Sequence, residues 1–147
     1  MRLQWETGDW TLRALVDTGA PITFFDRGAG EALGVRFGHA GAERGRMRVF
    51  GDSWEIQFEV VDLSLPVDTN FSWTARVAFA LNPGLVMPFQ GVLGTDGFLD
   101  KFAVTFNKYY DYFVVERSDD FHERAGRQLT SDPTQQADEH WRHAHGA

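Results

Sequence analysis

The sequence lacks cysteine altogether, which excludes disulfide bonds and thiolate chemistry. It also lacks an uninterrupted apolar run long enough to span a membrane. The N-terminal residues alternate between apolar and polar types before Glu6, a pattern that does not match a signal peptide. Basic residues are outnumbered by acidic ones, 14 to 21, and the net charge of −7 argues against binding to nucleic acid. These absences favour a cytoplasmic protein that binds neither membranes nor nucleic acid.

The residues that are present suit a single globular β-domain. A chain of 147 residues is long enough to form one domain with its own core. Phenylalanine and tryptophan are plentiful, at 13 and 5 residues, and aromatic side chains favour β-strands.

Apolar and alternating runs, bounded by turn residues, predict the positions of the strands. We expect strands at residues 2–5, 10–16, 22–25, 54–65, 71–81, 102–106 and 112–116. A short helix is expected over residues 26–34, with Asp26 as its N-cap and Gly34 as its end.

The most informative stretch begins where the apolar run 14–16 leads into Asp17. A carboxylate at the end of a buried strand is costly unless it is paired, hydrogen-bonded or protonated. Gly19 lets the backbone approach closely because it has no Cβ, and Thr18 places a hydroxyl beside the carboxylate. This arrangement can hold a working acid, although an ordinary turn between two strands can contain the same residues.

A second motif follows later in the chain. The number of residues between the two motifs is about that of one small β-barrel. Val92 and Leu93 are apolar, and Gly94 comes directly after them. Alone, this segment reads as a buried strand that ends in a turn. The order of the two motifs along the chain, together with their separation, argues against both occurring by chance.

Together the two motifs resemble those of the retropepsin-like aspartic proteases, over residues 1–116. The resemblance implies an all-β fold, a small closed β-barrel with one or two short helices, and it implies no cofactor and no metal ion. In these proteases a short helix follows the second motif, and here it would cover residues 95–101, with Thr95 or Asp96 as its N-cap. It makes Asp17 the catalytic residue. It also implies an active-site loop and a segment that supports this loop, formed by Thr18, Gly19, Ala20, Val92, Leu93 and Gly94.

The chain departs from many retropepsins at two positions. Those proteins have an acidic residue directly after the first motif and an arginine directly after the second, and the two residues pair and brace the dimer. Here the positions hold Pro21 and Thr95. The joint loss of both puts the retroviral dimer geometry in doubt and points to a cellular or bacterial branch.

Peptide hydrolysis of this type needs two carboxylates that share one proton, because like charges at that distance cannot both ionise. The sequence contains one Asp-Thr-Gly-Ala motif, so each chain supplies half a site. We therefore expect a homodimeric aspartic endopeptidase that acts on peptides or proteins. Its interface is expected to contain the loop around Asp17 and the edges of strands 2–5 and 112–116. Two alternatives stay open: a catalytically silent dimerisation or peptide-binding module of the same fold, and an unrelated small β-barrel that binds a ligand.

Residues 36–48 are rich in glycine and arginine and too polar for a core. They suit a solvated mobile loop, or the flap, the hairpin that closes over substrate in retropepsin-like proteases. The residues assigned to substrate binding in this flap are Gly41, Arg44, Gly45 and Arg46.

The polar segment 117–147 is predicted to be a disordered C-terminal tail. Three of its histidines, His140, His143 and His145, have a loose metal-ligand spacing. Because no cysteine and no stable scaffold accompany them, we interpret them as part of a solvated tail and expect no metal site.

Overall fold

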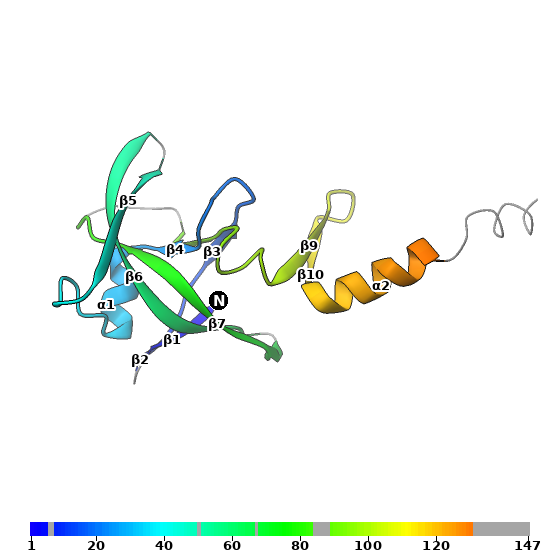
Figure 1. Cartoon of the computed structure of the whole chain (residues 1–147), viewed down its shortest axis with the longest axis horizontal. Coiled ribbons are helices and arrows are strands. Elements are labelled where there is room, and N and C mark those ends of the chain that lie inside the picture. The colour runs from blue at the N-terminus through cyan, green and yellow to red at the C-terminus, as the bar shows by residue number, and fades with distance from the viewer. Residues whose placement is uncertain (6–7, 50, 67, 84–88, 131–147) are drawn as a thin grey trace, which may run out of the picture. The chain divides into compact units, whose positions relative to one another are not determined.

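The computed structural model describes residues 1–5, 8–49, 51–66, 68–83 and 89–130 (Figure 1). The chain divides into two compact units, residues 1–100 and 101–147, which are described separately below. The predicted domain boundary at residue 116 differs from this division. The reason is that the last two strands pair with each other and not with the sheet of the first unit.

The first unit is built on one large, mostly antiparallel sheet, so the predicted all-β class is confirmed. Its strand order is β2-β1-β6-β7-β4-β8-β3, with β5 paired to β6. The strands are β1 (Arg2–Trp5), β2 (Gly8–Thr11), β3 (Ala14–Val16), β4 (Phe24–Phe25), β5 (Glu43–Val49), β6 (Asp52–Leu65), β7 (Asp68–Ala80) and β8 (Gly91–Leu93).

The predicted closed barrel is not formed among the described residues. β2 and β3 lie at opposite ends of the strand order and do not pair with each other. The strand predicted at residues 10–16 is split at Leu12, which is buried and whose N–H donates to the carbonyl of Met1 at 2.8 Å. This bond keeps β2 beside β1, whereas β3 pairs with β8.

The predicted first helix is confirmed as α1 (Arg27–Leu33). The Asp26 carboxylate accepts a hydrogen bond from the Ala29 N–H at 2.7 Å, and Gly34 ends the helix with a φ of 86°. A side-chain acceptor at the N-cap and a left-handed glycine at the end are typical helix boundaries. Ala29, Gly30 and Leu33 form the buried face of α1.

The predicted second helix is wrong. Residues 95–101 form turns, in which the N–H groups of Leu99 and Asp100 donate to the carbonyls of Gly94 and Thr95 at 3.0 and 2.9 Å. These bonds span five residues rather than the four of an α-helix. Gly97 has a φ of 91°, which breaks the helical path.

The second unit contains a hairpin and a helix: β9 (Phe102–Asn107), β10 (Tyr112–Arg117) and α2 (Ser118–Thr130). The prediction of a disordered tail is wrong for residues 118–130, which form α2. Asp119 and Asp120 lie in its first turn, where negative charge favours the helix dipole. Residues 131–147, with the three histidines noted above, lie outside the described residues.

A free edge was predicted for the strand at residues 2–5. That prediction is wrong, because β1 is paired on both sides, with β2 and with β6. In the described ranges, no helix is both long enough and apolar enough to cross a membrane.

Candidate active site

The two sequence motifs meet in the sheet through the short strand β8. β8 lies between β3, which runs parallel to it, and β4, which runs antiparallel to it. Residues 17–23 connect β3 to β4, so this segment, here called the Asp17 loop, must cross the end of β8. The predicted contact between the two motifs is therefore confirmed.

Hydrogen bonds fix the Asp17 loop onto the end of β8. The N–H of Asp17 donates to the carbonyl of Leu93 at 3.0 Å, and the N–H of Thr95 donates to the carbonyl of Ala20 at 2.8 Å. Further along, the N–H of Asp96 donates to the Pro21 carbonyl at 3.0 Å. Thus Thr95 and Pro21, the two departures from the retropepsin pattern, both take part in this contact through their backbone.

Asp17 lies just beyond the end of β3 and is half-buried. Its Oδ1 accepts a hydrogen bond from the N–H of Gly19 at 2.8 Å, while the neighbouring Thr18 is exposed. The expectation of a buried strand before Asp17 is wrong, since Leu15 in the middle of β3 is 42% exposed. β3 is the edge strand of the sheet and pairs only with β8 among the described strands, so Leu15 has few neighbours within the sheet.

Gly94 allows the close contact beneath the loop. A Cβ at this position would lie 2.3 Å from the carbonyl oxygen of Ile22 and 2.8 Å from that of Ala20. Both neighbours are backbone atoms of the Asp17 loop, so a side chain at residue 94 would displace the loop itself. Gly91, at the start of β8, is similarly enclosed by the ring of Phe25.

Sequence reasoning did not assign a supporting role to Thr23. This residue is fully buried, and its Oγ1 accepts a hydrogen bond from the N–H of Gly94 at 3.1 Å. Its own N–H donates to the Asp96 carbonyl at 2.8 Å. The sequence did contain a clue to this role, since Thr23 lies between the apolar residues Ile22 and Phe24. A threonine buried among apolar residues needs a hydrogen-bond partner for its hydroxyl group.

Replacing Thr23 with valine should destabilise the protein by about 1–3 kcal/mol, because the buried Gly94 N–H loses its acceptor while the shape is kept. Urea unfolding measures this change. Thr11→Val is the matched control, since Thr11 is exposed on β2, and its effect should stay within about 0.5 kcal/mol. Equal stability of the Thr23 and Thr11 variants would contradict the supporting role of the Thr23 hydroxyl.

Two other aspartates near the motifs have structural partners. Asp26 caps α1 through the Ala29 N–H, and the Asp100 carboxylate accepts from the Gly97 N–H at 3.0 Å. Both carboxylates therefore hold local backbone turns. Neither contact involves Asp17.

The hairpin assigned as a flap is formed by β5 and β6, and its boundaries differ from the prediction. Val49 pairs with Asp52, and Gly51 has a φ of 90°, so the turn lies after residue 49 rather than among the earlier glycines. Residues 36–42 do not form a hairpin. They are held to β6 by the buried Gln57, whose side chain accepts from the Gly38 N–H at 2.9 Å and donates to the Arg36 carbonyl at 3.2 Å.

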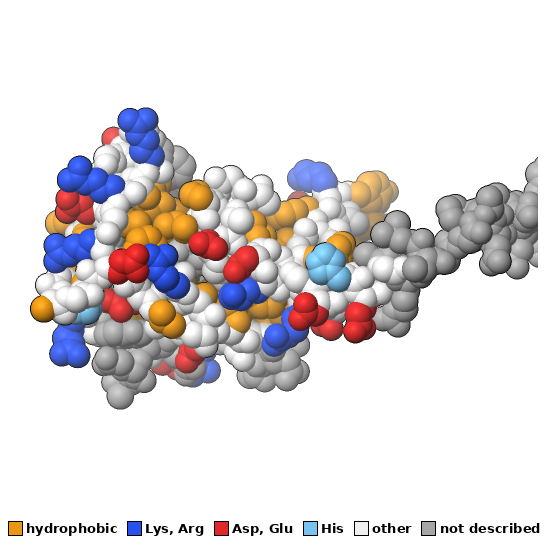
Figure 2. All heavy atoms as spheres, viewed as in Figure 1, with side chains coloured by type: hydrophobic (Ala, Val, Ile, Leu, Met, Phe, Trp, Pro, Cys, Tyr) orange, Lys and Arg blue, Asp and Glu red, His pale blue; other side chains and the backbone are white. Residues whose placement is uncertain are grey.

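The flap residues named from the sequence lie in two different places. Gly41 is in an exposed turn with a φ of 95°, outside the hairpin. Arg44 and Arg46 are exposed on β5, and basic side chains gather over this part of the molecule (Figure 2). Gly45 lies on the opposite, inner side of β5, where it pairs with Ile56. The arginines thus point away from the apolar side of the hairpin.

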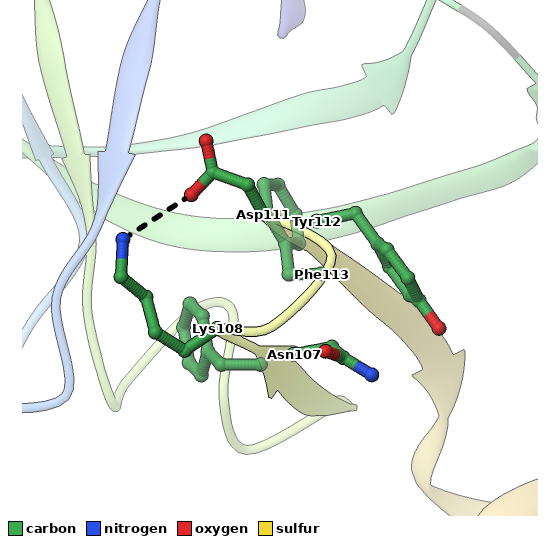
Figure 3. Close-up of a pocket in the computed structure, with 6 residues that line it drawn as sticks. Asn107, Lys108, Asp111, Tyr112 and Phe113 are labelled. Carbon is green, nitrogen blue, oxygen red and sulfur yellow. Dashed lines mark hydrogen bonds and ion pairs between the residues drawn. The ribbon is translucent and has the colours of Figure 1, made fainter.

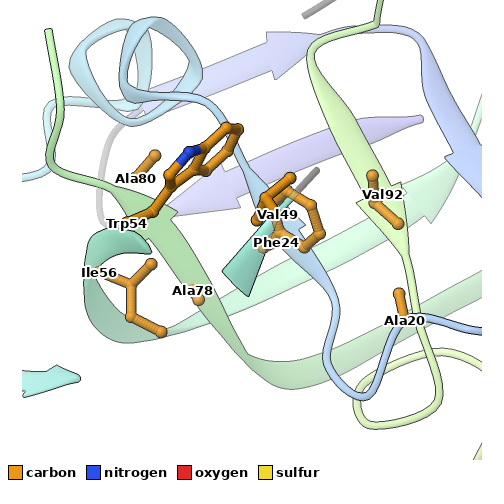
Figure 4. Close-up of a cluster of buried hydrophobic side chains, with 8 residues drawn as sticks. All are labelled: Ala20, Phe24, Val49, Trp54, Ile56, Ala78, Ala80 and Val92. Atoms are coloured by element: carbon orange, nitrogen blue, oxygen red, sulfur yellow. The ribbon is translucent and has the colours of Figure 1, made fainter. Parts of the chain in front are cut away.

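That apolar side packs into the core beneath the Asp17 loop (Figure 4). The cluster of buried side chains contains Ala20, Phe24, Val49, Trp54, Ile56, Ala78, Ala80 and Val92. The rings of Phe24 and Trp54 meet edge to face at a centroid distance of 6.2 Å. Ile22 and Met47 are only partly buried at the margin of this cluster, one from the loop and one from the hairpin.

Two shallow pockets lie elsewhere. One, of about 170 Å³, lies beside Glu59 and Arg76, and the other, of about 200 Å³, lies on the β9–β10 hairpin. Neither includes Asp17 in its lining. Among the described side chains, no group of three histidine, aspartate or glutamate residues is arranged to hold a metal ion.

Comparison with known proteins gave no relative, since no protein-family model, no curated protein and no solved structure matches the chain. The chemistry of the site is therefore inferred from its geometry and from the two motifs.

Proposed function

We propose that the chain is one half of an aspartic endopeptidase of the retropepsin-like type, in which Asp17 from each of two copies forms the catalytic pair. The observation that carries this proposal is the position of Asp17. Its carboxylate lies at the end of β3, accepts the Gly19 N–H at 2.8 Å, and belongs to a loop braced from below by Gly94. A rigidly supported loop is what a catalytic group needs for accurate positioning.

The two carboxylates would share one proton across the dimer axis. The charged carboxylate removes a proton from a water molecule, whose oxygen attacks the carbonyl carbon of the scissile peptide bond. The protonated carboxylate donates its proton to the carbonyl oxygen. The C–N bond then breaks as the carboxyl that took the water proton donates it to the amide nitrogen, while one hydroxyl of the tetrahedral intermediate returns its proton to the other carboxylate. An amine and a carboxylic acid are released, and the pair again holds one proton.

The surroundings of Asp17 favour apolar substrate side chains. Leu15, in the strand that leads into Asp17, is 42% exposed. Met47 and Ile22 add partly buried apolar surface at the margin of the nearby cluster. We therefore expect cleavage next to apolar residues of a peptide.

Peptidase activity should fall more steeply than protein concentration on dilution, because a complete site requires two chains. Below the dissociation constant of the dimer, a tenfold dilution should lower the rate about a hundredfold. The experiment measures cleavage of a random peptide pool over a protein dilution series, with sedimentation velocity reporting the dimer fraction. Cleavage by a demonstrated monomer would refute the shared site, and an inactive dimer would favour the silent peptide-binding alternative.

A further inference from the structure

The β9–β10 hairpin carries an apolar face that the second unit leaves open. Phe106 pairs with Phe113, and Val104 pairs with Val115, so these four side chains lie on one face of the hairpin. We call this set the open hairpin face. Phe106 and Phe113 are 58% and 53% exposed, and their rings lie 6.0 Å apart between centroids.

The neighbouring elements of the second unit do not cover this face. α2 packs against both strands, yet Phe106 and Phe113 remain more than half exposed in its presence. Within the described residues the hairpin has no third strand. Contiguous apolar side chains that remain exposed in this way are a feature of interaction surfaces. Figure 2 shows apolar side chains on this part of the molecule.

The turn of the hairpin is more polar than the open face. Lys108 and Asp111 form an ion pair across it at 3.4 Å, and Tyr112 and Phe113 begin the return strand (Figure 3). The turn also carries exposed tyrosines, Tyr109 at 87% and Tyr110 at 69%, whose rings lie 4.7 Å apart between centroids. A tyrosine hydroxyl can stay hydrogen-bonded to water, whereas Phe106 and Phe113 have no polar group. The open hairpin face therefore gains more from burial than the turn does.

We propose that a second copy of this chain covers the open hairpin face, with its own hairpin packed face to face. This inference rests on the proposed function, which requires a second copy because each chain supplies one Asp17. The chain's own C-terminal segment is a poor occupant. Residues 131–147 are mainly polar and contain Trp141 as their only large apolar residue.

The expected contact is modest in area. An aromatic side chain buries about 150–250 Å², so covering the exposed halves of two phenylalanines in each copy removes roughly 400 Å² from water. Stable interfaces bury about 1,200–2,000 Å² in total. The hairpin contact should therefore act together with other contacts, and the dimer should dissociate within an accessible concentration range.

The test is sedimentation velocity on the full chain over a concentration series. Phe106→Ser with Phe113→Ser should raise the midpoint concentration of dimerisation at least about tenfold, because the contact loses two apolar rings from each copy. Tyr109→Ser is the matched control, since it removes an exposed aromatic ring from the turn and should shift the midpoint less than about twofold. Circular dichroism verifies that the double variant keeps its strand content.

A second measurement uses the absence of cysteine in the chain. Phe113→Cys should form a disulfide-linked dimer on mild oxidation, and Tyr109→Cys should do so much more slowly at the same concentration.

An unchanged midpoint in the double serine variant, or equal cross-linking of the two cysteine variants, would overturn the hairpin contact while leaving the peptidase proposal standing. A wild-type dimer that fails to cleave peptides would refute the peptidase while a shifted midpoint still supports the hairpin contact. If the wild-type chain is a monomer at all concentrations, the proposed hairpin contact is wrong, and a different partner would have to cover the open hairpin face.

Discussion

Asp17→Asn should abolish peptide cleavage while the protein stays folded. The amide cannot take a proton from water, and general acid–base catalysis by a single group contributes about 10²–10⁴-fold, so we expect a loss of at least about a thousandfold. Asparagine keeps the size of aspartate, and its side-chain oxygen can still accept the Gly19 N–H. The variant dimer should also be more stable, because two neutral amides can lie side by side without the proton uptake that two carboxylates require. Initial cleavage rates, with circular dichroism on both proteins, measure these effects.

The matched control is Asp96→Asn, which makes the same chemical change at an exposed residue of the supporting segment. Its activity should remain within about twofold of wild type, since Asp96 contacts the loop through its backbone.

Mixing wild type with Asp17→Asn adds a test of the shared site. After subunit exchange, a fourfold excess of the variant should lower the wild-type rate to about one fifth, because random pairing leaves one wild-type chain in five with a wild-type partner. Undiminished activity in the mixture would show that one chain holds the complete site.

Gly94→Ala should lower the stability of the first unit by about 3 kcal/mol or more. The added Cβ would lie 2.3 Å from the Ile22 carbonyl oxygen and 2.6 Å from its carbon, and neither backbone atom can move without displacing the Asp17 loop. Overpacking by a methyl group typically costs about 1–3 kcal/mol, and a collision with backbone lies at the upper end of this range. In a unit of this size the midpoint of thermal unfolding should fall by at least about 12 °C.

Gly28→Ala is the matched control for this substitution in the same unit. A Cβ at Gly28 would lie 3.5 Å from Asp26 Oδ1, an ordinary contact, and alanine is favoured over glycine in a helix by about 0.5–1 kcal/mol. This variant should be as stable as wild type or slightly more stable. Similar melting temperatures for the two alanine variants would contradict the close packing beneath the loop.

Local features of the sequence were sufficient to predict α1 and most of the strands. Asp26 and Gly34 mark the ends of α1 through hydrogen bonds and backbone angles that involve only nearby residues. The alternation from Trp54 onward predicted β6, since a period of two residues directly indicates a strand with one buried side. The contact between the Asp17 loop and Gly94 was also expected, but from the family resemblance of the two motifs and not from local physics.

The features that sequence reasoning missed depend on residues far apart in the chain. The sequence pattern predicts one strand over residues 10–16. In the structure two strands form instead, because the Leu12 N–H donates to the Met1 carbonyl and β3 pairs with β8. Residues 36–42 read as part of a hairpin, but the buried Gln57 on β6 holds them as a separate loop. In each case a long-range hydrogen bond overrides the local preference.

The strand content, the first helix and the single aspartate motif can be recognised in the sequence, because backbone propensity and side-chain chemistry act locally. Three other features follow from tertiary contacts: Thr23 supports Gly94, the arginines of β5 point away from the apolar cluster, and Phe106 and Phe113 remain exposed to solvent. These depend on strand register and on which neighbours cover each face. Register and coverage follow from pairing across the whole fold, and no short stretch of sequence contains them.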